Sequence, residues 1–108
     1  MKLILKGLAA SSGEADGIVR VVSGIEDAPL FKEGEILVTT ITDPSMVAMM
    51  ARASAIVTDI GGVSSHPAIV SRELGIPCVT ATKTATKVLK NGQKVRVNGS
   101  SGEVFGLD

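Results

Sequence analysis

The chemistry-bearing residues of this sequence are gathered at its single histidine, His66, which follows two glycines and two serines within residues 61–66. Imidazole is a nucleophile near neutral pH and can form covalent intermediates. A glycine-rich turn offers backbone N–H groups in a concave nest that suits an anion. Gly61 and Gly62 also allow a ligand to approach the backbone closely. This combination predicts a histidine that accepts a phosphoryl group, whose oxygens contact backbone amides and the hydroxyls of Ser64 and Ser65.

The flanking residues predict a strand before the histidine and a short helix after it. Residues 55–58 are apolar and partly β-branched, as in a buried strand. Ser65 is a natural N-cap for a helix over 66–74, and Gly75 a natural end. The apolar face of this helix is expected to be Ile69, Val70 and Leu74. His66 would then lie at a helix N-terminus, where free N–H groups and the helix dipole favour an anion.

Residues 61–79 resemble the phosphorylation-site signature of the phosphoenolpyruvate-utilising enzymes. The matching features are two glycines, a hydroxyl residue two positions before the histidine, an aliphatic run ending in Arg72, and Glu-Leu-Gly-Ile-Pro at 73–77. Weaker similarity extends to residues 17–22, 34–39, 42–44 and 91 onward. The motif is most similar to that of phosphoenolpyruvate synthase and pyruvate phosphate dikinase; the superfamily also includes the first enzyme of the bacterial sugar phosphotransferase system.

The resemblance implies a β/β/α swivelling domain that accepts phosphoryl on His66 and passes it on. It also implies a nucleotide-binding partner and a phosphoenolpyruvate- or pyruvate-binding partner, as subunits or domains. Mg²⁺ with ATP or phosphoenolpyruvate is expected on those partners, and no metal or other cofactor on this chain. The chain is therefore expected to be inert alone, as one part of a phosphotransferase.

The resemblance also assigns roles around the histidine. Gly61, Gly62, Ser64, Ser65 and Arg72 are expected to bind phosphate, and Ser64 matches a position that in some relatives is a regulatory phosphorylation site. Arg72 lies nearly two helical turns beyond the histidine, so it could instead be a solvated residue paired with an acidic neighbour. The sequence departs from the family pattern at Thr80-Ala81-Thr82, where the family commonly has a glycine after the aliphatic strand.

Composition narrows the class of protein. The 108 residues suit one domain, 1–108, and 11 basic against 11 acidic residues give zero net charge. The sequence has no basic stripe, only two aromatics, and no apolar run of membrane-spanning length, which disfavours binding to nucleic acid or membranes. One cysteine excludes a disulfide framework, and Cys78 is expected in the core. A cytoplasmic protein is the simplest reading.

The overall pattern predicts an α/β fold, bordering on α+β, with a mixed sheet and short helices. Residues 7–16 and 23–33 are expected to be loops, the latter with a helical turn at 27–30. Asp43 and Pro44 predict the start of a helix over 44–53, whose methionines form a core face. A further one or two helical turns are expected within 84–89. Strands are expected at 2–6, 17–22, 36–40, 55–58, 77–80, 94–98 and 103–107.

Two other functions remain open. The chain could be a regulatory or interaction module of the same fold that is never phosphorylated, which burial of His66 under other side chains would favour. It could also be a small swivelling subunit of a dehydratase, because that fold recurs without phosphohistidine. Fold alone does not separate these alternatives.

Overall fold

The computed structural model describes residues 1–107 and shows one continuous mixed sheet of eight strands. The strand order is β1-β8-β7-β3-β4-β5-β6-β2. The bounds are β1 Lys2–Lys6, β2 Leu8–Ser11, β3 Glu14–Val21, β4 Ile36–Thr39, β5 Ala55–Thr58, β6 Cys78–Thr80, β7 Lys94–Asn98 and β8 Glu103–Gly106.

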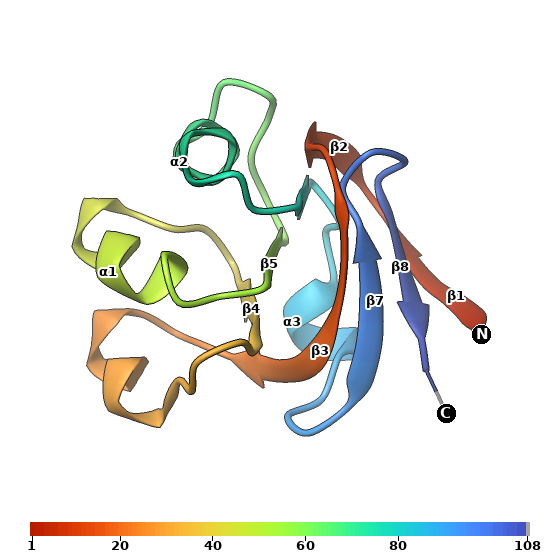
Figure 1. The fold of residues 1–108 in the computed structure, drawn as a ribbon, viewed down its shortest axis with the longest axis horizontal. Coiled ribbons are helices and arrows are strands. Elements are labelled where there is room, and N and C mark those ends of the chain that lie inside the picture. The colour runs from red at the N-terminus through yellow and green to blue at the C-terminus, as the bar shows by residue number, and fades with distance from the viewer. Residues whose placement is uncertain (108) are drawn as a thin grey trace.

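The sheet has an antiparallel half and a largely parallel half. Strands β1, β8, β7 and β3 pair antiparallel, whereas β3, β4, β5 and β6 pair parallel and β2 closes the far edge antiparallel to β6. Because β1 and β2 lie at opposite edges but are joined by Gly7 alone, the sheet must curl back on itself. Figure 1 shows the two halves facing each other, with helices outside the parallel half.

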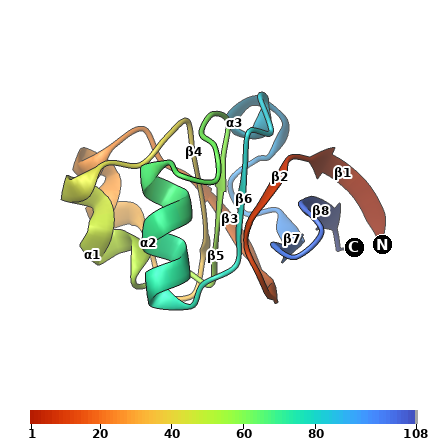
Figure 2. The same ribbon diagram turned by 90° about the horizontal axis from the view of Figure 1, so that it is seen from above.

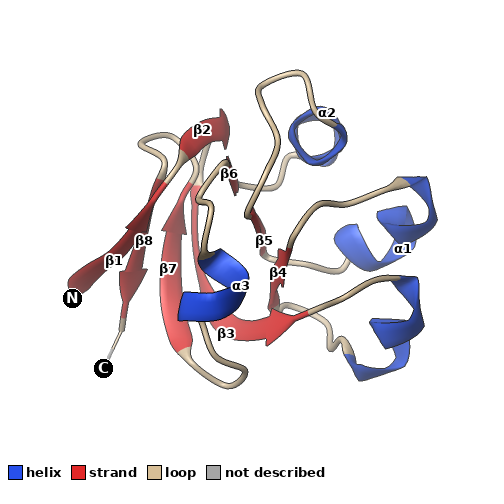
Figure 3. Cartoon of the chain, turned by 180° about the vertical axis from the view of Figure 1, so that it is seen from behind, coloured by secondary structure: helices blue, strands red, loops and turns tan. Residues whose placement is uncertain are grey.

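Alternating side chains of the parallel strands supply two cores. Ile36, Val38, Ala55 and Val57 point between the two halves of the sheet, where α3 (Ala85–Val88) adds Ala85. Leu37 and Ile56 point to the other face and meet the helices. The layers are therefore antiparallel sheet, parallel sheet and helices, as seen from above in Figure 2 and from behind in Figure 3. The expected α/β fold with a mixed sheet and short helices is confirmed.

The helical layer consists of α2 (His66–Leu74), α1 (Val47–Met50) and the 3₁₀ helices η1 (Ile25–Leu30) and η2 (Pro44–Met46). Asp43 caps η2 by accepting a hydrogen bond from Ser45 N, as its sequence position predicts. The predicted helix over 44–53 is divided, because a 3₁₀ turn precedes α1 and i→i−3 bonds tighten the chain after it. The buried Met46, Met49 and Met50 confirm the predicted core face.

One further prediction about secondary structure is wrong. Residues 7–16 are not a loop, since they contain β2 and the start of β3. The small side chains of β2 carry little strand propensity, and the strand depends on pairing with β6, some seventy residues away in the chain. The helical turn predicted at 27–30 is present as part of the 3₁₀ helix η1, which begins two residues earlier. Other boundaries shift by three residues or fewer.

Within residues 1–107, no helix has the length and apolar character needed to cross a membrane.

Candidate functional site

His66 is the first residue of α2, at the end of a turn that we call the histidine loop, residues 61–65. This loop follows β5, and residues 40–43 follow the adjacent parallel strand β4. Because parallel strands end at the same edge of a sheet, the two segments after them meet there. The imidazole is partly exposed, so it is accessible to another molecule without rearrangement of the core.

The imidazole is held by one hydrogen bond, between His66 Nδ1 and the Thr42 hydroxyl, with a separation of 2.7 Å. Thr42 is only 3% exposed, so its side chain is a fixed partner rather than a mobile surface group. This contact occupies the ring nitrogen nearer the backbone and leaves Nε2 as the nitrogen available for chemistry. When Thr42 Oγ1 accepts from Nδ1–H, Nε2 carries the lone pair that a nucleophile needs.

The sequence predictions did not assign a role to Thr42, although residues 42–44 belong to the resembling stretches. The position of Thr42 in the sequence could have indicated a role, because a polar residue soon after strand β4 should lie near the residues that follow the adjacent parallel strand β5. What could not be read from sequence is the direction of the side chain toward the histidine.

The two glycines of the loop differ in what the fold requires of them. Gly61 has a φ of +121°, and a Cβ built there would lie 2.8 Å from Ser65 Oγ. Glycine at this position is therefore needed by the loop itself. A Cβ at Gly62 would meet nothing within 4 Å. The open space beside the Gly62 backbone leaves room for a ligand, and the role of Gly62 in phosphate binding stays a prediction.

Ser65 occupies the predicted N-cap position, but its hydroxyl does not cap the helix. It donates instead to Gly62 O at 2.6 Å and so closes the loop. The first hydrogen bond of α2 runs from Ile69 N to Ser65 O, which leaves the backbone N–H groups of His66 and Ala68 outside the helical ladder. The missing cap therefore leaves donors at the helix N-terminus that could serve an anion.

Ser64 is exposed on the loop two residues before the histidine. Exposure is what both a modification site and a ligand contact require. Phosphate binding and regulation by Ser64 both stay predictions.

Arg72 has a structural use that the sequence did not reveal. Its Nη1 donates to Ala10 O at 2.8 Å and its Nη2 donates to Val63 O at 2.7 Å. The guanidinium thereby ties the histidine loop to strand β2. It is not paired with Asp59, whose carboxylate accepts from Thr86 N and Thr86 Oγ1 at 2.9 and 2.5 Å. Contact between Arg72 and phosphate stays a prediction.

Asp43 supplies negative charge near the site. Hydrogen bonds from the Ser45 hydroxyl and backbone N–H hold the pKa of the Asp43 carboxyl below its ordinary value, and the nearby His66 contributes in the same direction. An ionised carboxylate here opposes an anion on the histidine. For an anion to be held on His66, attraction from the N–H donors of the histidine loop and the helix N-terminus must therefore exceed the repulsion from Asp43.

The predicted apolar face of α2 is wrong in part, and the error concerns the site. Val70 packs against the core as predicted, but Ile69 and Leu74 are exposed. The buried residues of this helix are Pro67, Ala68 and Ser71, whose small side chains allow α2 to lie close to the sheet. Ile69 is 43% exposed instead, together with Ile60 and Val63, each 54% exposed. We call these three residues the apolar collar. Ile60 precedes the histidine loop, Val63 lies in it, and Ile69 lies in the first turn of α2 after His66.

Cys78 is buried as predicted, and burial raises the pKa of its thiol to about 11.

A family comparison agrees with this geometry. The family described as "PEP-utilising enzyme, mobile domain" matches residues 31–102, which include the histidine loop, Thr42 and Arg72. The chain belongs to this family.

Relatives of this mobile domain include phosphoenolpyruvate synthases. The chain is 58% identical over 104 residues to phosphoenolpyruvate synthase of Pyrococcus furiosus and 56% identical to a probable phosphoenolpyruvate synthase of Archaeoglobus fulgidus. Each alignment covers 96% of this chain but only 13% and 14% of the respective relative. The mobile domain thus spans about one seventh of the length of these proteins.

Solved structures agree on the fold. A solution structure of an Enzyme I protein (nEIt) has a TM-score of 0.60 and 34% identity, covering 68% of this mobile domain and 31% of that chain. Aconitase X of Thermococcus kodakaraensis has a TM-score of 0.71 and 25% identity, covering 96% of this domain and 98% of that chain.

Proposed function

We propose that this mobile domain is a phosphoryl carrier in which Nε2 of His66 accepts the phosphoryl group. The observation that carries the proposal is the contact between the buried Thr42 hydroxyl and Nδ1 at 2.7 Å. It fixes the plane of the imidazole and occupies the nitrogen nearer the backbone. Support also comes from the open space at Gly62, in the loop before His66, and from the backbone N–H groups at the start of α2 that lie outside the helical ladder.

The transfer requires no further nucleophile from this chain. The Nε2 lone pair attacks the phosphorus of a donor, a P–N bond forms, and the bond from phosphorus to the leaving oxygen breaks. Nδ1 keeps its proton and donates it to Thr42 Oγ1 in a hydrogen bond, which stabilises the positive charge that develops on the ring. In the second step an acceptor oxygen attacks phosphorus, and the P–N bond electrons return to Nε2. Such reactions depend chiefly on positioning and charge stabilisation.

The partners are proposed to be other parts of a larger protein or complex, one binding ATP and one binding phosphoenolpyruvate or pyruvate. Mg²⁺ and the nucleotide would be held there, and this domain would supply the mobile histidine. The apolar collar of Ile60, Val63 and Ile69 supports docking around His66, because exposed aliphatic side chains favour burial against a partner. Docking would also exclude water from the phosphoryl group.

The positions of the chain ends suit a domain that swings. Strands β1 and β8 pair, with Lys2 opposite Gly106, so the two ends lie side by side. Figure 1 shows them on the side of the sheet remote from α1 and α2. Connections to neighbouring domains at this edge would leave the helical layer, with His66 at the start of α2, free to face two partners in turn.

One observation favours a second candidate, a subunit of an aconitase-type dehydratase. The match to aconitase X covers nearly all of both chains. Its identity of 25% is far below the 56–58% shared with phosphoenolpyruvate synthases, so the carrier is preferred. A non-phosphorylated regulatory module is less well supported, because His66 is partly exposed rather than buried.

Phosphorylation of the purified chain tests the proposal. The chain and its His66→Ala variant would each be incubated with phosphoramidate, a small donor that needs no partner, and with ATP or phosphoenolpyruvate in a lysate of the source organism. We expect an adduct of one phosphoryl group that is labile in acid, stable in alkali and absent from the folded variant. An adduct that survives acid would assign the modification to serine. No adduct with any donor would reject the carrier function.

A further inference from the structure

We propose that a second site on this domain, a cavity beside Arg72, binds a small oxyanion and is coupled to the histidine loop. The cavity has a volume of about 610 Å³ and lies between β2, the end of α2 and the turn from β7 to β8. No residue of the histidine loop lines it. Arg72 follows His66 by six residues, which is about 9 Å along the helix.

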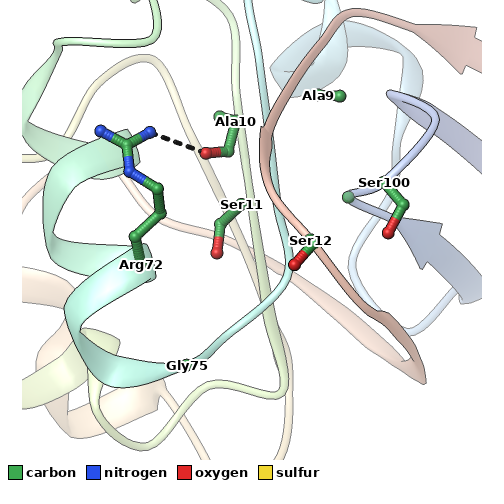
Figure 4. Close-up of a pocket in the computed structure, with 8 residues that line it drawn as sticks. Ala9, Ala10, Ser11, Ser12, Arg72, Gly75 and Ser100 are labelled. Atoms are coloured by element: carbon green, nitrogen blue, oxygen red, sulfur yellow. Dashed lines mark hydrogen bonds between the residues drawn. The ribbon is translucent and has the colours of Figure 1, made fainter.

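The lining predicts the class of ligand. Ser11, Ser12 and Ser100 bring hydroxyl groups to the cavity, and Arg72 brings a positive charge. Figure 4 shows Arg72 of α2 and the C-cap residue Gly75 on one side, Ser100 on the other, and Ser11 and Ser12 between them. Within residues 1–107 no acidic or aromatic residue lines the cavity. Hydroxyl donors with a guanidinium suit a carboxylate or phosphate group rather than a cation or a nucleobase.

Two features show that the walls of this open cavity are ordered. Ser11 is only 5% exposed, so its side chain is fixed by the surrounding backbone. The turn from β7 to β8 also presses closely on this segment, because a Cβ at Gly99 would lie 1.8 Å from Ser11 O. The walls are therefore held by packing and do not need to be ordered by the ligand.

The C-terminal end of α2 works against an anion, because the helix dipole is negative there. Its last carbonyls are already bonded, however: Ser71 O accepts from Ile76 N, and Arg72 O accepts from Gly75 N. Gly75 closes the helix in a left-handed conformation with a φ of 71°. The guanidinium itself is turned away from this end of the helix, since it donates to Ala10 O and Val63 O, and two of the terminal carbonyls are no longer free acceptors.

Arg72 also gives the cavity a connection to the histidine. Its two donated bonds, to Ala10 O and Val63 O, leave three of the five N–H groups of the guanidinium for another acceptor. An anion that accepts hydrogen bonds from this guanidinium would weaken or redirect the hydrogen bond from Arg72 to Val63 O, three residues before His66. Binding would then change the histidine loop. By linkage, phosphorylation of His66 would change the affinity for the anion by the same factor by which the anion changes the phosphorylation equilibrium. The coupling rests on the proposed function, whereas the binding does not.

The test is a titration of the 108-residue chain followed by amide ¹H–¹⁵N correlation spectra. Inorganic phosphate and pyruvate are the probes, which separates phosphate from carboxylate, and sodium chloride at matched ionic strength controls for screening. We expect saturable shifts at millimolar concentration for the amides of Ser11, Ser12, Ser100 and Val63 with at least one probe. Shifts that are linear, or equal to those in chloride, would overturn the site.

Three variants localise the site. His66→Ala should bind the probe as well as the native chain does, whereas Ser11→Ala and Arg72→Lys should weaken it at least severalfold. Binding that is lost in His66→Ala, with shifts confined to residues 61–66, would place the anion at the histidine and reject the cavity. Full affinity in Ser11→Ala and in a folded Arg72→Lys would also reject it.

The coupling is measured as the rate of phosphorylation by phosphoramidate with and without saturating probe. We expect a rate change of at least twofold in the native chain and none in Ser11→Ala at the same probe concentration. An unchanged rate in a chain that does bind the probe would reject the coupling, while leaving both the cavity and the phosphoryl carrier intact.

Discussion

Replacing Thr42 by valine tests whether the hydrogen bond to Nδ1 makes His66 an effective nucleophile. Valine has nearly the shape of threonine and lacks only the hydroxyl, so the packing of a residue that is 3% exposed should be preserved. The lost bond, between atoms 2.7 Å apart, is worth about 0.5–1.5 kcal/mol to stability. Because His66 is partly exposed, water can replace the hydroxyl, and the loss of stability should lie toward the lower end of this range.

The effect on phosphoryl transfer should be larger, because the ring is then free to rotate and to place its proton on Nε2. A loss of about 1–2 kcal/mol of transition-state positioning lowers the rate about 5- to 30-fold. The rate would be measured with phosphoramidate, so that partner docking does not contribute. NMR of ¹⁵N-labelled histidine would report the tautomer of the free chain and the nitrogen that carries phosphorus. We expect Nε2 alone in the native chain and a share of Nδ1 adduct in Thr42→Val.

Thr42→Ser is the matched control, since it keeps the hydroxyl and removes a methyl group. It should retain the native tautomer and lose less rate than Thr42→Val does. If Thr42→Val reacts as fast as the native chain, at the same nitrogen and with the same tautomer, the contact is incidental. The argument that selects Nε2 would then be refuted.

Three other perturbations give separate outcomes. Gly61→Ala should lower the free energy of unfolding by about 1–2 kcal/mol, because its φ of +121° disfavours a side chain. Gly62→Val should leave urea denaturation unchanged and slow phosphoryl transfer. A Gly62→Val variant that is less stable than Gly61→Ala but transfers phosphoryl at the native rate would contradict the assignment of the open space to a ligand. Ala81→Gly should raise the free energy of unfolding by up to about 1 kcal/mol, because Ala81 has a φ of 57°, and a destabilised variant would show that the left-handed conformation costs little here. Burial by itself raises the pKa of Glu35, but hydrogen bonds from Arg20 and a backbone amide outweigh this effect, so the pKa of Glu35 is lowered. The stability that Glu35 contributes is therefore present above its unfolded pKa near 4.5 and is lost as the pH falls through the lower folded pKa. The urea midpoint of Glu35→Gln should therefore lie below that of the native chain at pH 7 and approach it in acid, and a constant difference across this range would refute the linkage.

The chemistry and local form of the site were determined largely by sequence. A lone histidine behind Gly61 and Gly62, with Gly75 at the end of a short helix, specified a strand, a turn and a helix N-terminus, because these depend on backbone preferences of adjacent residues. The methionines at 46, 49 and 50 likewise indicated a buried face through their spacing. The departure from the family pattern at residues 80–82 was also visible in the sequence, and the positive φ of Ala81 shows why a glycine would suit this segment.

Tertiary structure decided the features that depend on residues far apart in the chain. Strand β2 exists because β6 pairs with it, and its own small side chains do not specify a strand. Ile69 is exposed because α2 packs through Pro67, Ala68 and Ser71, and helical spacing alone does not say which face a sheet will cover. Thr42 meets His66 because the parallel strands β4 and β5 end at one edge of the sheet. Arg72 meets Ala10 because β2 pairs with β6 and lies next to α2, and the same guanidinium reaches Val63. Side-chain direction and long-range backbone pairing are set by packing of the whole domain, and local sequence carries no direct record of them.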